Sequence, residues 1–160
     1  LAIQTDIGNR TMIAYNLSNL GAVFVVFWDF AQAREYHLQS LAVLREISDR
    51  WAMAMVLNSL AETSIELSDL ESAGKSLREG MALSLEIEAP TLMFNALIVA
   101  AALLHAGGKT ARALELLATA LAHPKIDAEN SELANRWWER AAASVPAKQA
   151  EAIRKSARQR

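Results

Sequence analysis

Residues 57–77, LNSLAETSIELSDLESAGKSL, contain two apolar stripes at helical spacing on either side of the polar break Ser68-Asp69. Shifted by 40 positions, the chain aligns with itself in several sets: Ile7, Ile47 and Ile87; Leu17, Leu57 and Leu97; Gly21, Ala61 and Ala101; Ala33, Ala73 and Ala113; Leu41, Met81 and Leu121. Many matches at one fixed period are the signature of a repeat architecture. We therefore predict an all-α fold of repeated helical hairpins.

Small residues explain how the hairpins could stack. Each repeat has one on both of its helices, as Ala61 and Ala73 show, and small side chains let two helices approach closely. We expect large apolar residues to fill the space between helices and between successive hairpins: Leu20, Phe24, Leu60, Leu77, Leu104 and Leu117. One hairpin alone could not bury such a stripe, so we predict a stack of them.

The register predicts three hairpins in residues 1–124, at about 7–47, 48–87 and 88–124. After Pro124 the 40-residue register fails, and residues 125–160 are predicted to form two capping helices, near 128–144 and 147–159. Terminal units of repeat arrays are commonly atypical. The chain begins at Leu1, so we expect it to be a fragment of a longer protein.

The order of small and large residues resembles the tetratricopeptide repeat. The matching positions are Leu17, Leu20, Gly21 and Ala33; Leu57, Leu60, Ala61, Ala73 and Leu77; and Leu97, Ala101, Ala113 and Leu117. His37 stands where the motif prefers an aromatic residue, Ser64 stands where it prefers Tyr, and the longer period implies longer helices. The resemblance implies a right-handed α-solenoid that binds other proteins.

The joints between helices narrow this resemblance. Residues 44–51, LREISDRW, and 85–90, LEIEAP, resemble the joints of long-period repeats in large bacterial signalling proteins. Residues 123–124, 134–140 and 145–147 resemble the C-terminal cap of those arrays. The relatives are STAND-type regulatory ATPases and LuxR-like or SARP-like transcriptional regulators. The resemblance implies a cytoplasmic sensor or scaffold region at the C-terminal end of such a regulator.

Neither the composition nor the residue spacing indicates a catalytic, metal-binding or cofactor site. The chain has no cysteine and a formal charge of −2, and we expect no direct contact with nucleic acid or a membrane. Gly107-Gly108-Lys109-Thr110 imitates a phosphate-binding loop, but Leu103 stands where that loop requires glycine. His37, His105 and His123 show no metal-ligand spacing. We therefore predict a non-enzyme with no catalytic residue, no metal site and no cofactor.

In a stack of hairpins, the first helix of each lines the concave surface, where we expect a peptide or partner protein to bind. The predicted groove residues are Tyr15, Ser18, Asn19 and Ala22; Met55, Asn58, Ser59 and Glu62; and Asn95, Ile98, Val99 and Ala102. Two alternatives stay open. The apolar residues 25–28, VVFW, near a hairpin tip could mediate self-association into a homo-oligomer, and the array could instead sense a small-molecule effector.

Overall fold

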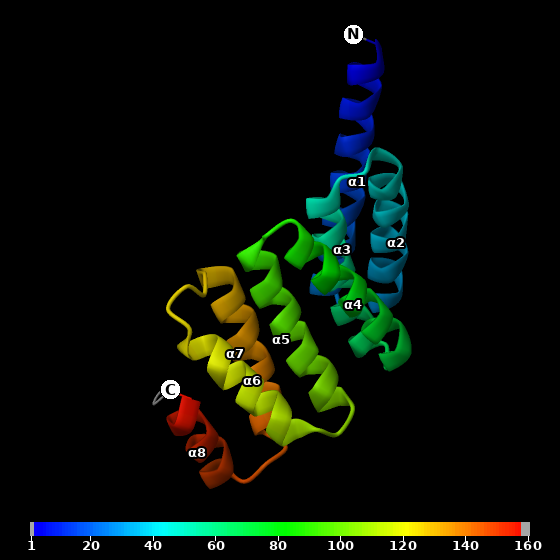
Figure 1. The fold of residues 1–160 in the computed structure, drawn as a ribbon. Helices are drawn as coiled ribbons and strands as arrows, with labels where there is room; N and C mark the ends of the chain where they lie inside the picture. The colour runs from blue at the N-terminus through cyan, green and yellow to red at the C-terminus, as the bar shows by residue number, and fades with distance from the viewer. Residues whose placement is uncertain (1, 158–160) are drawn as a thin grey trace. The chain divides into compact units, whose positions relative to one another are not determined.

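The computed structural model describes residues 2–157, with side chains described from residue 8 onward, and this part of the chain forms eight α-helices (Figure 1). The helices are α1 (Ala2–Val26), α2 (Phe30–Ile47), α3 (Arg50–Glu66), α4 (Leu70–Glu86), α5 (Pro90–Ala106), α6 (Thr110–Ala122), α7 (Ala128–Ala142) and α8 (Ala147–Ala157). They pack consecutively in adjacent pairs: α1 with α2, α3 with α4 and α5 with α6. The predicted all-α, solenoid-like fold of helical hairpins is confirmed.

The joints between the helices from α1 to α6 share one backbone conformation, a residue with positive φ. Trp28, Ser48, Ser68, Glu88 and Gly108 all have φ between 51° and 78°, in the left-handed region. At the first joint, the amide of Asp29 donates to the carbonyl oxygen of Phe24 at 3.0 Å, which satisfies an acceptor that the helix end leaves open. These residues recur every 20 positions, so each helix with its joint occupies half of the 40-residue period.

Aspartates begin several of the helices. The carboxylate of Asp29 accepts a hydrogen bond from the amide of Gln32 at 3.1 Å, and three other aspartates do the same for their helices: Asp49, Asp69 and Asp127. This N-cap satisfies one of the amides that a helix start leaves without an internal partner. Lys109 occupies the corresponding place before α6 and makes no side-chain cap.

The chain divides into two units, residues up to Ala89 and residues from Pro90 onward. In the first unit, α2 packs against both α1 and α3. Its core includes a buried cluster on α1, α2 and α3: Ala14, Leu41, Leu44, Ala52, Val56, Leu57 and Leu60. Exposed ion pairs recur with the 40-residue period, since Arg10 pairs with Glu46 and Arg50 pairs with Glu86. Exposed pairs contribute little stability, so the buried apolar residues contribute most of the stability of this unit.

The crossing of α1 and α2 contains a buried histidine. A Cβ atom added at Gly21 would lie 2.6 Å from Cε1 of His37, so the ring occupies space that only glycine leaves free. Burial lowers the pKa of His37 to about 4. Its Nδ1 atom has no hydrogen-bond partner within the described part of the chain. The ring is therefore neutral at pH 7.

In the second unit, α7 packs against both α5 and α6, and α8 packs against α6. Trp137 and Trp138 of α7 are buried, and the Arg154 guanidinium of α8 lies 5.3 Å from the Trp138 ring. Nδ2 of Asn130 donates to the carbonyl oxygen of Thr91 at 3.1 Å, which joins α7 to α5. The predicted boundary between hairpins and cap, after residue 124, stays a prediction.

Candidate protein-docking surface

The structure buries five of the predicted groove residues: Ser18, Asn58, Ile98, Val99 and Ala102. The prediction that these residues are exposed is wrong. On α1, Ser18 shares a helix face with Ala14 and Gly21, which are both buried. One repeat later, Asn58 holds the same position, and its Oδ1 would lie 2.7 Å from a Cβ atom at Gly80 of α4. This helix face meets the partner helix of its own hairpin.

The buried groove residues of α5 have a further reason for their burial. Ile98, Val99 and Ala102 belong to a helix that packs against both α6 and α7. Asn95, the remaining predicted groove residue of this helix, is half-buried. A partner contact at Asn95 stays a prediction.

The other predicted groove residues lie on α1 and α3 in the first unit and are at least partly exposed: Tyr15, Asn19, Ala22, Met55, Ser59 and Glu62. Tyr15 already has an intramolecular role. Burial and the hydrogen-bonded carboxylate of Asp49 together raise the pKa of Tyr15. Its hydroxyl thus links α1 to the N-cap of α3. Partner binding by this face stays a prediction.

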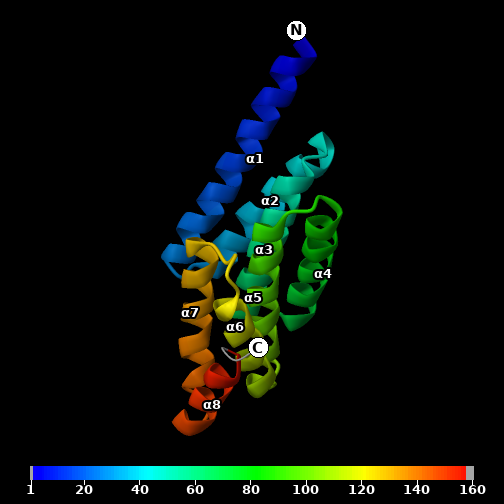
Figure 2. The ribbon, with the colours of Figure 1, turned by 60° about the vertical axis from the view of Figure 1, so that its left-hand side comes forward.

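A second face, formed by α1 and the residue that follows it, is largely apolar and uncovered. It comprises Met12, Asn16, Leu20, Val23 and Phe27, which we call the α1 stripe. Steps of three and four residues place these side chains on one side of the helix, and all five are exposed. Met12 is 63% exposed and Phe27 is 74% exposed. α1 is also the longest helix, and its first turns project past the end of α2 in both views (Figures 1 and 2).

Four of these five repeat positions are covered on α3, whereas the fifth, Leu67, is 38% exposed. One period after Met12, Asn16, Leu20 and Val23 stand four buried residues: Ala52, Val56, Leu60 and Thr63. Leu41 and Leu44 of α2 belong to the same buried cluster as the first three of them. We expected Leu20 to fill space between helices, but it is 43% exposed, because no helix within residues 2–157 covers this face of α1 as α2 covers α3.

The tip of the first hairpin extends this apolar surface. Val26, Phe27 and Trp28 are each more than 70% exposed. Trp28 also adopts φ of 62°, a region that L-residues with bulky side chains avoid. Its ring meets Phe30 edge-on at 5.9 Å. Neither burial nor backbone preference favours tryptophan at this position.

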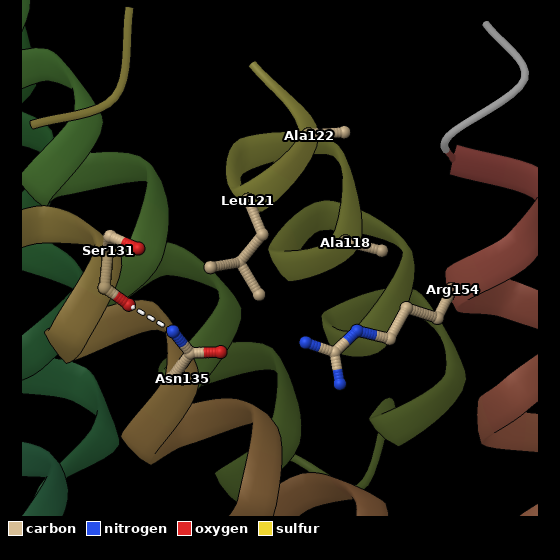
Figure 3. A pocket seen from close by; sticks show the side chains of 6 residues that line it. All are labelled: Ala118, Leu121, Ala122, Ser131, Asn135 and Arg154. Atoms are coloured by element: carbon tan, nitrogen blue, oxygen red, sulfur yellow. Dashed lines mark hydrogen bonds between the residues drawn. The ribbon is translucent and has the colours of Figure 1, made fainter. Parts of the chain in front are cut away.

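A small pocket of about 220 Å³ lies in the second unit (Figure 3). It is lined by residues of three helices: Ala118, Leu121, Ala122, Ser131, Asn135 and Arg154. Asn135 donates to the carbonyl oxygen of Ser131 at 2.9 Å, and Arg154 reaches over the Trp138 ring. Typical small-molecule sites measure about 300–1,000 Å³. The pocket therefore gives effector sensing less support than the α1 stripe gives protein docking.

Two further searches bear on function. Among residues 2–157, no helix combines the length and the apolarity that crossing a membrane requires. Among residues 8–157, whose side chains the structure describes, no group of three or more His, Asp or Glu is placed to hold a metal ion. Comparisons with protein-family models, with curated proteins and with solved structures found no match for this chain. Functional inference therefore rests on the surface itself.

Sequence reasoning located only the end of the α1 stripe, through residues 25–28. One signal could have revealed the whole of it. No charged residue occurs from Thr11 to Trp28, a run of 18 positions. A helix with solvent on one side normally carries charged residues there, so the run indicates a face that meets another molecule.

Proposed function

We propose that this chain is a non-catalytic protein-interaction module, a scaffold of tetratricopeptide-like hairpins that docks a partner protein. The uncovered α1 stripe is the observation that carries the proposal. Contiguous exposed apolar surface on a soluble chain marks a docking site more often than scattered apolar residues do. Aromatic anchors beside it, Phe27 and Trp28, belong to the residue types that contribute most to binding energy at interfaces.

The resemblance to bacterial signalling regulators supplies the wider setting. We place the module in the cytoplasm, at the C-terminal end of a STAND-type or LuxR-like regulator, where docking would change its contact with an effector domain. A peptide could also bind along the neighbouring face of α1 and α3, where Asn19, Met55 and Glu62 are at least partly exposed.

The test compares the partners that wild-type and altered chains retain. Val23→Glu with Phe27→Glu places two charges on the α1 stripe, whereas the control Leu85→Glu places one charge at an exposed leucine of α4. Each chain is immobilised in the cell extract, and the retained proteins are identified by mass spectrometry. Binding is then measured with the purified partner. We expect a partner retained by wild type and by the control to be lost from the double variant.

Two results would contradict the proposal. One is an identical set of retained proteins for all three chains. The other is a retained protein whose affinity, once purified, is the same for the double variant as for wild type. Circular dichroism and melting temperature of the variants show whether a loss of binding reflects the surface or the fold. Asn19→Arg with Met55→Arg tests the groove face in the same way.

A further inference from the structure

We infer that the pocket of the second unit binds a small 2-hydroxy acid. In this site, Arg154 holds the carboxylate of the ligand and Asn135 accepts a hydrogen bond from its hydroxyl group. The inference goes beyond the proposed docking function, because the α1 stripe belongs to the first unit and contributes nothing to this pocket.

The pocket is open because the residues of α6 that line it are mostly small. Helix α6 packs against both α7 and α8, and Ala118 and Ala122 line the pocket one helical turn apart. Their methyl groups leave a space that longer side chains would fill. Leu121 adds an apolar wall beside them (Figure 3).

The single charged residue that lines the pocket is a cation. The guanidinium of Arg154 points into the pocket from α8, and the Trp138 ring lies 5.3 Å from it (Figure 3). Within residues 8–157, no carboxylate forms an ion pair with Arg154. A guanidinium is charged at pH 7 and can bind a carboxylate through two parallel hydrogen bonds. One cation matches a carboxylate better than a phosphate group, which carries a charge of about −2.

The opposite wall supplies a hydrogen-bond acceptor. Nδ2 of Asn135 donates to the carbonyl oxygen of Ser131 at 2.9 Å, which fixes the orientation of the amide and leaves its Oδ1 atom on the pocket side (Figure 3). No donor among residues 8–157 bonds to this Oδ1 atom. A ligand with a hydrogen-bond donor next to its carboxylate would therefore satisfy Arg154 and Asn135 together.

The chemistry of the acceptor selects a hydroxyl group over an ammonium group as that donor. Oδ1 of Asn135 is neutral, and no acidic residue lines the pocket. An ammonium group would lose its water of hydration there without gaining a negative partner, which is costly. A hydroxyl group requires only the one acceptor.

The volume of the pocket limits the size of the ligand. A space of about 220 Å³ corresponds to about seven water molecules at about 30 Å³ each. The compound 2-hydroxybutanoate has about this number of non-hydrogen atoms, and its ethyl group can contact Leu121 and Ala118. We therefore choose it as the probe.

The first measurement is a titration of the isotope-labelled 160-residue chain with 2-hydroxybutanoate, followed by amide chemical shifts. We expect saturable shifts in α6, α7 and α8. Butanoate lacks the hydroxyl group and 2-aminobutanoate replaces it with an ammonium group, so each should bind at least about fivefold more weakly. The absence of saturable shifts up to about 10 mM probe overturns the inference. Equal or tighter binding of either control compound overturns the assignment of the hydroxyl group.

Variants test the residues that hold the probe. Arg154→Gln should raise the dissociation constant at least about tenfold, whereas the control Lys155→Gln removes an exposed charge outside the pocket and should not. Asn135→Ala should make 2-hydroxybutanoate and butanoate bind equally. Unchanged affinity in Arg154→Gln, or the same loss in Lys155→Gln, overturns a specific contact with Arg154.

A second kind of variant guards against a loss of folding in Arg154→Gln, since that change also removes the contact with Trp138. Ala122→Leu fills the pocket without altering any charge and should abolish binding of the probe. Circular dichroism and melting temperature show that each variant is folded. Wild-type affinity in folded Ala122→Leu overturns the pocket as the site.

The two proposals fail separately. Val23→Glu with Phe27→Glu should bind 2-hydroxybutanoate as wild type does, because the α1 stripe and the pocket lie in different units. A wild-type chain that binds no probe, but loses a partner protein in this double variant, refutes the pocket and supports the docking surface. A chain that binds the probe, but whose retained proteins do not depend on the α1 stripe, refutes the docking surface alone.

Discussion

At the crossing of α1 and α2, Gly21 meets the ring of His37, whereas the same repeat positions in the next hairpin hold Ala61 and Leu77. All four residues are buried. The first hairpin combines the smallest residue with a polar ring, and the second combines a methyl group with a branched aliphatic chain. Both pairs are buried at the crossing, so this repeat position accepts pairs of different chemistry.

The two hairpins differ again one turn away. In the first, Oγ of Ser40 donates to the carbonyl oxygen of Ala14 at 2.7 Å. In the second, Gly80 takes the place of Ser40 and leaves room for the larger Asn58. Each hairpin thus accommodates a buried polar side chain. The first hairpin does so with the hydrogen bond of Ser40, and the second does so because Gly80 has no side chain.

The largest expected difference between the hairpins is the pH dependence of stability. The pKa of His37 is about 4 in the folded chain against 6.5 in an exposed histidine, so the unfolded chain binds the additional proton between these values. The free energy of unfolding should therefore fall as the pH drops from 6.5 to 4, by about 3 kcal/mol. Urea unfolding followed by circular dichroism measures it.

The matched control is His37→Leu, which introduces the residue found at position 77. It should remove this part of the pH dependence, while carboxylates such as Asp69 and Asp127, whose pKa values are lowered, contribute equally to both chains. Parallel stability curves for wild type and His37→Leu over this pH range would contradict the burial of a neutral ring.

Gly21→Ala should have the next largest effect. The new Cβ atom would lie 2.6 Å from the His37 ring, and we expect a destabilisation of about 2 kcal/mol at pH 7 from overpacking. Gly21→Ala with His37→Leu recreates the pair of the second hairpin and should recover most of this loss. The coupling energy from the double-mutant cycle measures this recovery. Additive effects would show that the two residues do not share one space.

Lys109→Asp extends the comparison to the third hairpin. Lys109 has φ of −93° and ψ of 49°, close to the −90° and 73° of Asp29, but it caps nothing. An aspartate should accept a hydrogen bond from the α6 amides and stabilise the chain by about 1 kcal/mol. The melting temperature measures the gain, and Lys109→Ala serves as the control that removes the charge without adding a cap. Equal melting temperatures for both variants would count against a cap.

Trp28→Gly should have the smallest effect, and a stabilising one. At the equivalent joint, Gly108 adopts its left-handed conformation without the strain that a side chain adds. We expect a gain of about 0.5 kcal/mol, because glycine's larger entropy loss on folding offsets part of the relieved strain. Chemical denaturation of the monomer measures it, with Ser48→Gly as a second site of the same geometry. Lower stability in both variants would show that these joints are not strained.

Much of the fold was predictable from local chemistry. The 40-residue register and the polar break Ser68-Asp69 predicted helical hairpins and a joint that the structure confirms. The exposure of the groove residues was predicted less well, because their distance in sequence from the small residue of each repeat does not show which helix face a neighbour covers. Ser18 and Asn58 lie on the stripe that faces the partner helix, and polar side chains at those positions looked exposed only because their partners were not yet known.

The sequence alone determined where helices begin, where they end and which residues repeat, since those depend on interactions within a few residues of each other. Only the tertiary structure decided which repeated residues are covered. Leu20 and Leu60 are the same residue at the same repeat position, yet the first is 43% exposed and the second 2%. The difference comes from α2, which covers α3 and has no counterpart on the outer side of α1 within the described chain. The burial of a residue therefore depends on the helix that packs against it as well as on the residue itself.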